Sequence, residues 1–259
     1  MVHILRAAGC VFAEDEARLL RAAAGTPAEL ADLVHRRAAG LPLEQVLGWA
    51  EFCGLRIAVE PGVFVPRRRS EFLVRQAAER LRSLARRAVV VDLCCGTGAL
   101  GVALRAALDG RVDLHAADLD PAAVRCAQRN VAPGRVYQGD LFRPLPATLR
   151  GRVDALVANV PYVPTDEVGL LPPEARLHEP LTALDGGADG LDVLRRVADE
   201  APAWLAPGGC LLVETSQRQA ARAVAAFARS GLRPRTVRSA ELNVTVVVGT
   251  RTPARPRLG

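Results

Sequence analysis

The arrangement of apolar and polar positions divides the chain into two parts. Up to about residue 87, apolar residues recur mainly at helical spacing, whereas from Ala88 onward short apolar runs alternate regularly with helical segments. Regular alternation of strand and helix predicts a mostly parallel sheet that is covered by helices on both faces. The expected fold class is therefore α/β and Rossmann-like, with a small N-terminal helical domain. Ligands are expected at the carboxyl ends of the strands.

The first part is predicted to contain a helical region, a hairpin and one further helix. Residues from about 4 to 50 have helical periodicity, and Thr26 and Glu29 have the pattern of a capped helix start. Residues 51–59 form two short apolar runs around a glycine, which predicts a β-hairpin. The helix after this hairpin is expected to begin at residue 70 and to reach about residue 87.

The second part is predicted to supply the sheet and its covering helices. The predicted strands cover residues 89–93, 112–117, 136–137, 155–158, 210–213 and 244–248, and the predicted helices cover residues 99–108, 121–131, 190–205 and 217–230. Four segments follow from this division: a helical lid or substrate-recognition domain (1–48), a β-hairpin hinge (49–70), an α/β domain (71–251) and a disordered tail (252–259).

Composition and charge limit the classes of partner. Half of the 259 residues are hydrophobic, which suffices for a sizeable core, and no apolar stretch is long enough for a membrane helix. The net charge is +6, yet the basic residues are mixed with acids along the chain and aromatic residues make up only 4%. We therefore expect a soluble, cytoplasmic, monomeric protein with no membrane partner and no dedicated nucleic-acid surface. The six cysteines lack zinc or redox spacing, so no metal is expected.

A glycine-rich sequence follows the first strand of the second part. Residues 96–101 match G-x-G-x-x-G, and Asp118 follows about 20 residues later, as in dinucleotide-binding proteins. An NAD-dependent oxidoreductase is therefore one candidate, although no His and Arg pair for hydride transfer is obvious. Against it, Asp92 at the strand end suits an ammonium group better than a pyrophosphate.

Residues 92–98 resemble motif I of class I methyltransferases, which is written D/E-x-G-x-G-x-G. Cys94 stands at the first glycine of that motif, and Gly96, Thr97 and Gly98 follow it. If the position of Cys94 requires a positive φ, a side chain there is strained and cofactor affinity suffers. The resemblance implies S-adenosyl-L-methionine (SAM) as cofactor, with the acidic residue of the motif at its ammonium group.

Two more acidic residues follow the next strands. Asp118 ends the second strand and can accept hydrogen bonds from both ribose hydroxyls; the alternative is helix capping, which Asp120 serves better. Asp140 and Leu141 follow the third strand, where methyltransferases hold the adenine ring. Asp140 would accept from the adenine amino group and Leu141 would supply an apolar face, with a plain turn aspartate as the alternative.

Asn159-Val160-Pro161-Tyr162 directly follows the fourth strand. A side-chain amide, a backbone carbonyl, a rigid proline and an aromatic ring make a polar clamp for another planar amide or amine. The alternative is an ordinary turn at the end of a strand, with a buried tyrosine. The glycine loop and the acidic residues at neighbouring strand ends favour the clamp, because all of them meet at one edge of the sheet.

The stretch from residue 42 to residue 251 resembles the HemK/PrmC family of protein N5-glutamine methyltransferases. Four motifs carry the resemblance: residues 42–52 with the family's hinge segment, 65–71 with I-P-R-P-x-T-E, 159–162 with N-P-P-Y, and 179–191 with E-P-x-x-A-L-x-G-G-x-x-G-L. Nucleic-acid amino-methyltransferases share N-P-P-Y but not the last motif, so the combination is specific. Residues 1–41 match only as a small helical lid that is shorter than usual.

The resemblance implies a Rossmann-like class I methyltransferase that transfers a methyl group from SAM to a glutamine side chain. The typical substrate is the Gly-Gly-Gln loop of a peptide-chain release factor. By resemblance, the Asn159 side-chain oxygen and the Val160 carbonyl accept the two N–H bonds of the substrate amide, Pro161 stiffens the loop, and Tyr162 packs against the amide plane. Asn159 is also expected beside the cofactor. Val160 replaces a proline of the family motif, so weaker pre-organisation or altered substrate choice is expected.

Other functions stay open on the sequence alone. The clamp and the positive charge also suit an N6-adenine or N2-guanine methyltransferase of RNA. The departures at Cys94 and Val160 suit a SAM-binding module that has lost turnover, and the glycine spacing keeps the NAD-dependent enzyme as a further candidate.

Overall fold

The computed structural model describes residues 1–252, and the predicted disordered tail lies outside the described residues from residue 253 onward. The strands are β1 (Trp49–Phe52), β2 (Leu55–Ala58), β3 (Ala88–Leu93), β4 (Val112–Asp118), β5 (Arg135–Gln138), β6 (Val153–Ala158), β7 (Leu205–Thr215), β8 (Leu232–Ser239) and β9 (Val244–Arg251). The α-helices are α1 (Val2–Ala7), α2 (Ala13–Ala23), α3 (Pro27–Ala38), α4 (Leu43–Leu47), α5 (Glu71–Leu81), α6 (Ala99–Ala107), α7 (Pro121–Val131), α8 (Pro173–His178), α9 (Leu181–Leu184), α10 (Asp192–Trp204) and α11 (Ala220–Arg229).

Seven strands form one sheet in the order β5-β4-β3-β6-β7-β9-β8. The first five in this order run parallel, and β9 and β8 add an antiparallel edge. The chain leaves β3 toward β4 and β5 and then returns to β6 on the other side of β3. Ligands of open α/β sheets bind where the strand order reverses in this way, at the carboxyl ends of the strands. The mixed, mostly parallel sheet confirms the predicted fold class.

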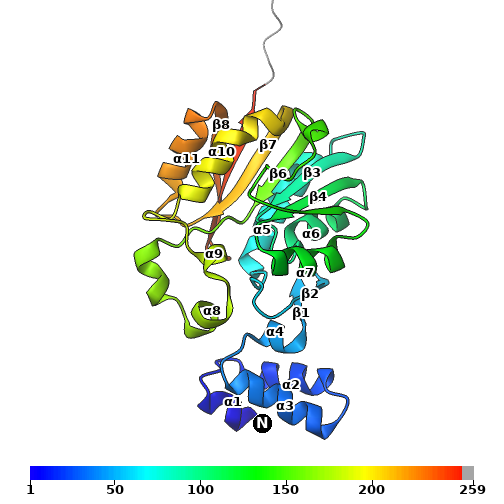
Figure 1. Cartoon of the computed structure of the whole chain (residues 1–259), viewed down its shortest axis with the longest axis vertical. Coiled ribbons are helices and arrows are strands. Elements are labelled where there is room, and N and C mark those ends of the chain that lie inside the picture. Colours follow the sequence, from blue (N-terminus) through cyan, green and yellow to red (C-terminus); the bar gives the residue numbers. More distant parts are fainter. Residues whose placement is uncertain (253–259) are drawn as a thin grey trace, which may run out of the picture.

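Helices cover both faces of the sheet (Figure 1). On one face, α5, α6 and α7 share a buried apolar core with strand residues such as Val90 and Leu114. On the other face, α10 and α11 share a second core with strand residues such as Val91 and Leu211. Alternate residues of one strand therefore enter different cores, which explains why the strands are continuously apolar in the sequence.

The N-terminal helices have a core of their own, which includes Leu5, Leu20 and Val34. In Figure 1 they form a separate layer below the α/β part, and α4 and the β1–β2 hairpin lie between the two. As predicted, the Thr26 hydroxyl caps α3 by accepting a hydrogen bond from the Glu29 N–H.

Two helical segments end before the predicted residue, and one strand of the sheet was not predicted. The N-terminal helical region ends at Leu47 because Gly48 takes a left-handed conformation (φ 79°), and β1 begins directly after it. The helix expected to reach residue 87 ends at Leu81. The sequence pattern did not predict β8, because four of the eight residues of this edge strand are exposed polar residues and the strand lacks an apolar run.

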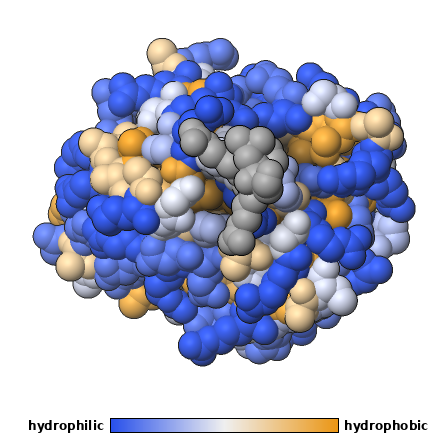
Figure 2. Space-filling view, turned by 90° about the horizontal axis from the view of Figure 1, so that it is seen from above, coloured by the Kyte–Doolittle hydropathy of each residue, from blue (hydrophilic) through white to orange (hydrophobic). Residues whose placement is uncertain are grey.

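The end of the molecule opposite the N-terminal helices is predominantly hydrophilic, with apolar residues in small separate groups (Figure 2). No helix within residues 1–252 is long and apolar enough to cross a membrane. Large exposed apolar side chains occur in the N-terminal helical region, including the connection between α1 and α2, and on the segment that contains α8 and α9; they include Ile4, Val11, Phe12, Leu170, Leu177 and Leu181.

Candidate active site

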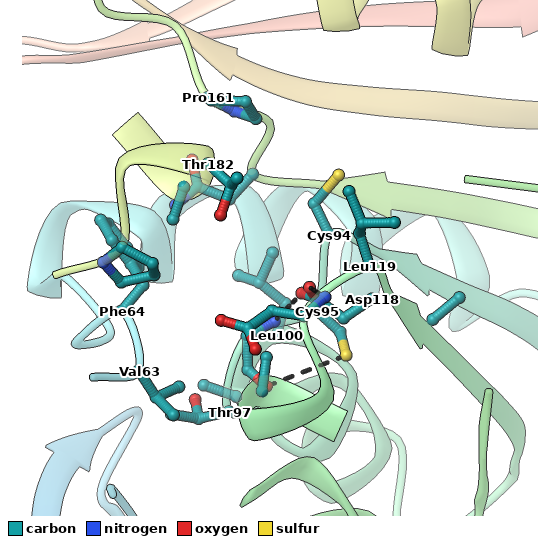
Figure 3. Close-up of a pocket in the computed structure, with 18 of the residues that line it drawn as sticks. Val63, Phe64, Cys94, Cys95, Thr97, Leu100, Asp118, Leu119, Pro161 and Thr182 are labelled. Atoms are coloured by element: carbon teal, nitrogen blue, oxygen red, sulfur yellow. Dashed lines mark hydrogen bonds between the residues drawn. The ribbon is translucent and has the colours of Figure 1, made fainter. Parts of the chain in front are cut away.

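A cavity lies where the sheet topology predicts a ligand, at the carboxyl ends of β3, β4, β5 and β6. In Figure 3, Cys94 and Leu119 lie on the opposite side of this cavity from Phe64, and Thr182 and Pro161 lie at one end. The cavity brings together most of the residues predicted from the sequence: Cys94, Gly96, Thr97, Asp118, Asp140, Leu141, Asn159 and Pro161. Asp92 and Gly98 are not among its lining residues.

The glycine-rich loop contains three residues with positive φ: Cys94 (52°), Gly96 (54°) and Gly98 (76°). The cysteine therefore occupies a backbone conformation that favours glycine. The sequence analysis expects strain at Cys94 in this case. Gly98 allows close packing, and its predicted contact with the cofactor stays a prediction. A Cβ atom built there would lie 2.6 Å from the Val131 side chain, so glycine allows α6 to begin close against α7.

Asp118 ends β4 at the cavity wall. Its two carboxylate oxygens accept hydrogen bonds from the Gly96 N–H (2.8 Å) and the Asp120 N–H (2.9 Å). Burial raises the pKa of Asp118, and these backbone hydrogen bonds oppose that rise. Each oxygen has a second lone pair, so the carboxylate can still accept from hydroxyl groups of a ligand. The capping role falls to Asp120, which accepts from the Ala122 N–H at the start of α7.

Asp140 and Leu141 line the next part of the cavity. The Asp140 carboxylate pairs with the Arg196 guanidinium at 2.6 Å, a contact between segments that are far apart in the sequence. Arg196 also lines the cavity and was not predicted. Leu141 is buried with a positive φ (49°), which turns the chain after Gly139.

Asp92 lies fully buried behind the glycine loop. One oxygen accepts from the Gly101 N–H at 2.9 Å, and the other has no hydrogen-bond partner within residues 1–252. Burial raises the pKa of Asp92 to about 8, although the bond from Gly101 lowers it. The bond from Gly101 orients the first turn of α6, and the contact of Asp92 with an ammonium group of the cofactor stays a prediction.

Asn159 leaves β6 between the first cavity and a second one. The second cavity is also lined by Val160 and Tyr162 from the predicted clamp, and by Leu171 and Pro172. The side-chain oxygen of Asn159 is buried without a hydrogen-bond partner among the described residues. A buried amide oxygen without a partner costs about 1–3 kcal/mol, so this position is suited to a donor that the described chain does not supply.

The segment after α9 packs directly on residues 159–162, called the clamp loop below, and on Val163, which follows this loop. Val163 and Asp185 form an isolated parallel bridge, in which the Val163 N–H bonds the Leu184 carbonyl (3.0 Å) and the Gly186 N–H bonds the Val163 carbonyl (2.8 Å). A Cβ atom at Gly186 would lie 2.7 Å from the Pro161 carbonyl oxygen, and one at Gly190 would overlap the Tyr162 carbonyl. The glycines of the 179–191 motif therefore allow two backbones to meet.

Two arginines from the 65–71 motif were not predicted as site residues. Arg67 lines both cavities and pairs with the buried Glu179 carboxylate at 2.6 Å. Arg69 pairs with the buried Glu214 at 2.9 Å and donates to the Tyr162 hydroxyl. Burial raises the pKa of Tyr162 and Glu214 adds to the rise, while Arg69 opposes it. These partners are more than 90 residues apart, so single-sequence patterns carry no signal for them.

The first cavity fits SAM on the observations above. Asp118 can accept from hydroxyls, Leu119, Leu141 and Phe64 offer apolar surface for a flat ring, and Asn159 has an unpaired buried oxygen. A pyrophosphate in this cavity would face the carboxylates of Asp118 and Asp140, and the guanidinium of Arg196 is already paired with Asp140. Within residues 1–252, no group of three His, Cys, Asp or Glu side chains could hold a metal ion.

Comparisons with known proteins agree with this geometry. The model of the methyltransferase small domain matches residues 54–170. A release factor glutamine methyltransferase of Geobacter sulfurreducens is 41% identical over 212 residues, which cover 79% of this chain and 72% of that protein. A 4-amino-L-phenylalanine/4-methylamino-L-phenylalanine methyltransferase of Streptomyces pristinaespiralis is 39% identical over 206 residues, covering 76% of this chain and 69% of that protein.

Among solved structures, a methyltransferase from Pyrococcus furiosus matches with a TM-score of 0.55 at 17% identity, covering 77% of this chain and 90% of that one. This likeness concerns the fold alone. The identity to curated relatives over most of both chains is the stronger finding. On that basis, the chain belongs to the family of release factor glutamine methyltransferases.

Proposed function

We propose that this protein transfers a methyl group from SAM to the side-chain nitrogen of a glutamine in the Gly-Gly-Gln loop of a peptide-chain release factor. The observation that carries the proposal is the Asn159 amide oxygen, which is buried, lacks a partner among the described residues and lies where both cavities meet. One cavity suits the cofactor and the other suits a substrate side chain. The names of several relatives support the choice of substrate.

Membership in the family makes the chain a SAM-dependent methyltransferase and replaces the NAD-dependent alternative. Asp118, Leu141 and the backbone of the glycine loop, including that of Cys94, would hold the cofactor, which supplies an electrophilic methyl group on a positively charged sulfur. The residues around Asn159 would then have to orient the substrate amide.

A carboxamide nitrogen is a poor nucleophile because its lone pair is delocalised into the carbonyl group. The protein must therefore orient this nitrogen, and no base has to remove a proton first. The Asn159 side-chain oxygen and the Val160 carbonyl would accept its two N–H bonds. They would align the nitrogen and stabilise the positive charge that develops on it. Tyr162, held by Arg69, would flank the amide plane.

The remaining parts of the proposal concern the substrate and the setting. Pro42, next to α4, and the segment around Leu171 bound the second cavity, so the N-terminal helices would act as a lid over a protruding loop. The exposed Leu170 and Leu177 offer apolar contact to a protein substrate. We expect a monomer that acts in the cytoplasm, where release factors work.

Incubation with labelled SAM and a purified release factor tests the substrate. We expect label on the loop glutamine and none when that glutamine is replaced by alanine. Parallel reactions contain bulk RNA and 4-amino-L-phenylalanine, because a relative of similar identity is named for the latter. Label in either of these, but not in the loop, would contradict the glutamine assignment. SAM binding in calorimetry without label in any reaction would favour a module that has lost turnover.

Asn159→Ala tests the role of the clamp. We expect kcat to fall by a factor of about 10² to 10³, because one positioned acceptor is lost in the transition state. The dissociation constant for SAM, measured by calorimetry, should change by less than about tenfold, since most cofactor contacts come from the other strand ends. Asn159→Asp keeps an acceptor oxygen and should retain more activity. Loss of SAM binding without a separate effect on turnover would show that the role is wrong.

A further inference from the structure

The Gln219 side chain joins three segments that are distant in the sequence. Its amide nitrogen donates to the Tyr162 carbonyl (2.8 Å) and to the Asp189 carbonyl (3.0 Å). Its amide oxygen accepts from the Ser216 hydroxyl (2.6 Å). Gln219 is 5% exposed, so both N–H bonds of a buried amide are used on the backbone of the clamp loop and of the turn before α10. Such a satisfied buried network fixes the position of the groups it joins.

Gln219 itself is held firmly. It is the residue directly before α11, whose apolar side packs into the second core through Ala223 and Phe227. The Ser216 hydroxyl orients the amide, so that the nitrogen and not the oxygen faces the two carbonyls. The hydrogen bonds of Gln219 therefore tie the clamp loop to a rigid helix and not to another loop.

The clamp loop needs a restraint on its backbone conformation from outside the loop. Its first two residues supply the substrate acceptors, but no ring fixes the φ of Val160, whereas a proline at this position would fix it. The Val160 side chain is buried in the second core, which anchors one end of the loop. The other end, at Tyr162, is the point where Gln219 bonds and where Gly190 allows the close approach.

We propose that Gln219 is a positioning residue for methyl transfer: it holds the Tyr162 carbonyl and so supplies the restraint on the clamp loop that a proline at position 160 would otherwise give. The inference rests on the proposed function of Asn159 and Val160 as acceptors. It adds that their alignment depends on a glutamine about 60 residues away, which touches neither cavity.

A set of four variants tests the proposal: Gln219→Met, Val160→Pro, the two combined, and Gln217→Met as the control. Methionine keeps the length of the side chain and removes the donors, and Gln217 is an exposed neighbour on the same loop. For Gln219→Met we expect kcat on the methyl acceptor to fall about tenfold or more, with the SAM dissociation constant within about twofold. Adding Val160→Pro should restore most of the kcat lost in Gln219→Met, whereas the control Gln217→Met should change kcat little.

Hydrogen exchange gives a readout that needs no methyl acceptor. The amides of residues 159, 162, 163 and 165 should exchange faster in Gln219→Met and return toward wild-type rates in the double variant. If Gln219→Met does not fold, Ser216→Ala, which only removes the orienting hydroxyl, should show the same pattern more weakly. Unchanged exchange in these residues, or a double variant no better than Gln219→Met, would overturn the proposal. Absence of any methyl acceptor for the wild-type protein would contradict the proposed function, while the exchange experiment still decides whether Gln219 holds the loop.

Discussion

Cys94 and Cys53 share a backbone conformation that L-residues other than asparagine and aspartate rarely adopt, each with a φ of 52°. Cys53 lies in the tight turn of the β1–β2 hairpin beside Gly54, where such values match the twist of the strands. Cys94 lies in the cavity wall, at the first glycine position of the methyltransferase motif. Substitutions at the two cysteines can therefore be compared. Both report the energetic cost of a positive φ, but only the substitution at Cys94 also reports its effect on cofactor binding.

We predict that Cys94→Gly stabilises the free protein by about 1 kcal/mol, because glycine accepts the left-handed region without a Cβ clash. It should also tighten SAM binding, since the loop no longer carries a side chain against the cofactor. Cys53→Gly should give a similar gain in the free energy of unfolding but leave the SAM dissociation constant unchanged. Denaturant unfolding and calorimetry measure the two quantities. Equal SAM affinity in wild type and Cys94→Gly would show that the cysteine does not hinder the cofactor.

At the residue scale, the sequence predicts which strand ends carry chemistry but not how each side chain is used. Asp118 and Asn159 lie at the cavity as expected, because the carboxyl ends of parallel strands meet at one edge. Asp92 and Gly98 do not line the cavity, because Asp92 is buried and bonded to the first turn of α6, and Gly98 packs against α7; no local pattern in the sequence shows either contact. Gln219 and Arg69 contribute through partners far away in the sequence, which a single chain does not reveal.

At the scale of elements, the segment from Glu179 to Leu191 acts as a support for the clamp loop. It bonds Val163 through the bridge at Asp185, and its glycines allow the carbonyls of residues 161 and 162 to approach. This contact gives a physical reason why the 179–191 motif and the clamp occur together in one chain. The sequence predicts most strands and helices of the second part within a few residues, yet it predicts neither α8 nor α9, whose short turns have no periodic pattern.

Gly190→Ala tests this support, with Gly208→Ala as the matched control. Both glycines have a positive φ (72° and 81°), so both substitutions carry the same conformational strain of about 1 kcal/mol. A Cβ atom at Gly208 meets open space, whereas at Gly190 it overlaps the Tyr162 carbonyl and the Gln219 amide. We expect Gly190→Ala to lower the free energy of unfolding by about 2–4 kcal/mol and to impair methyl transfer. Equal effects of the two variants in denaturant titrations would contradict the close approach.

At the scale of the whole molecule, a chain of polar contacts connects the N-terminal helices to the active site. Arg37 on α3 pairs with Glu16 inside the helical domain (2.6 Å) and with Glu174 on α8 (3.2 Å). Gln45 on α4 donates to the carbonyls of Val63 (3.1 Å) and His178 (3.2 Å). Glu179, which directly follows His178, continues the connection. Its carboxylate accepts from the N–H of Val65, two residues after Val63, and pairs with Arg67 in the cavity wall.

This connection explains why three motifs that are remote in the sequence accompany one another. Residues 42–48 supply Gln45, residues 65–71 supply Arg67, and residues 179–191 supply Glu179. The sequence resemblance identified the motifs but not their contact, since no local pattern states that they meet. The helical domain in Figure 1 is thus connected to the rest of the protein in two ways: through the chain at α4, and through the hydrogen bond to the His178 carbonyl on α8.

Gln45→Met tests whether this attachment serves the substrate or the cofactor. The variant leaves the Val63 and His178 carbonyls without their shared donor, and we expect it to lower the free energy of unfolding by about 1–3 kcal/mol. Because the first cavity contains no residue before Phe52, the SAM dissociation constant should stay within about twofold. The KM for the protein substrate should rise about tenfold, since the lid no longer keeps its position over the second cavity. Gln128→Met, an exposed glutamine on α7, is the control. A loss of SAM affinity equal to the rise in substrate KM would show that the helical domain supports the cofactor cavity and does not act as a lid.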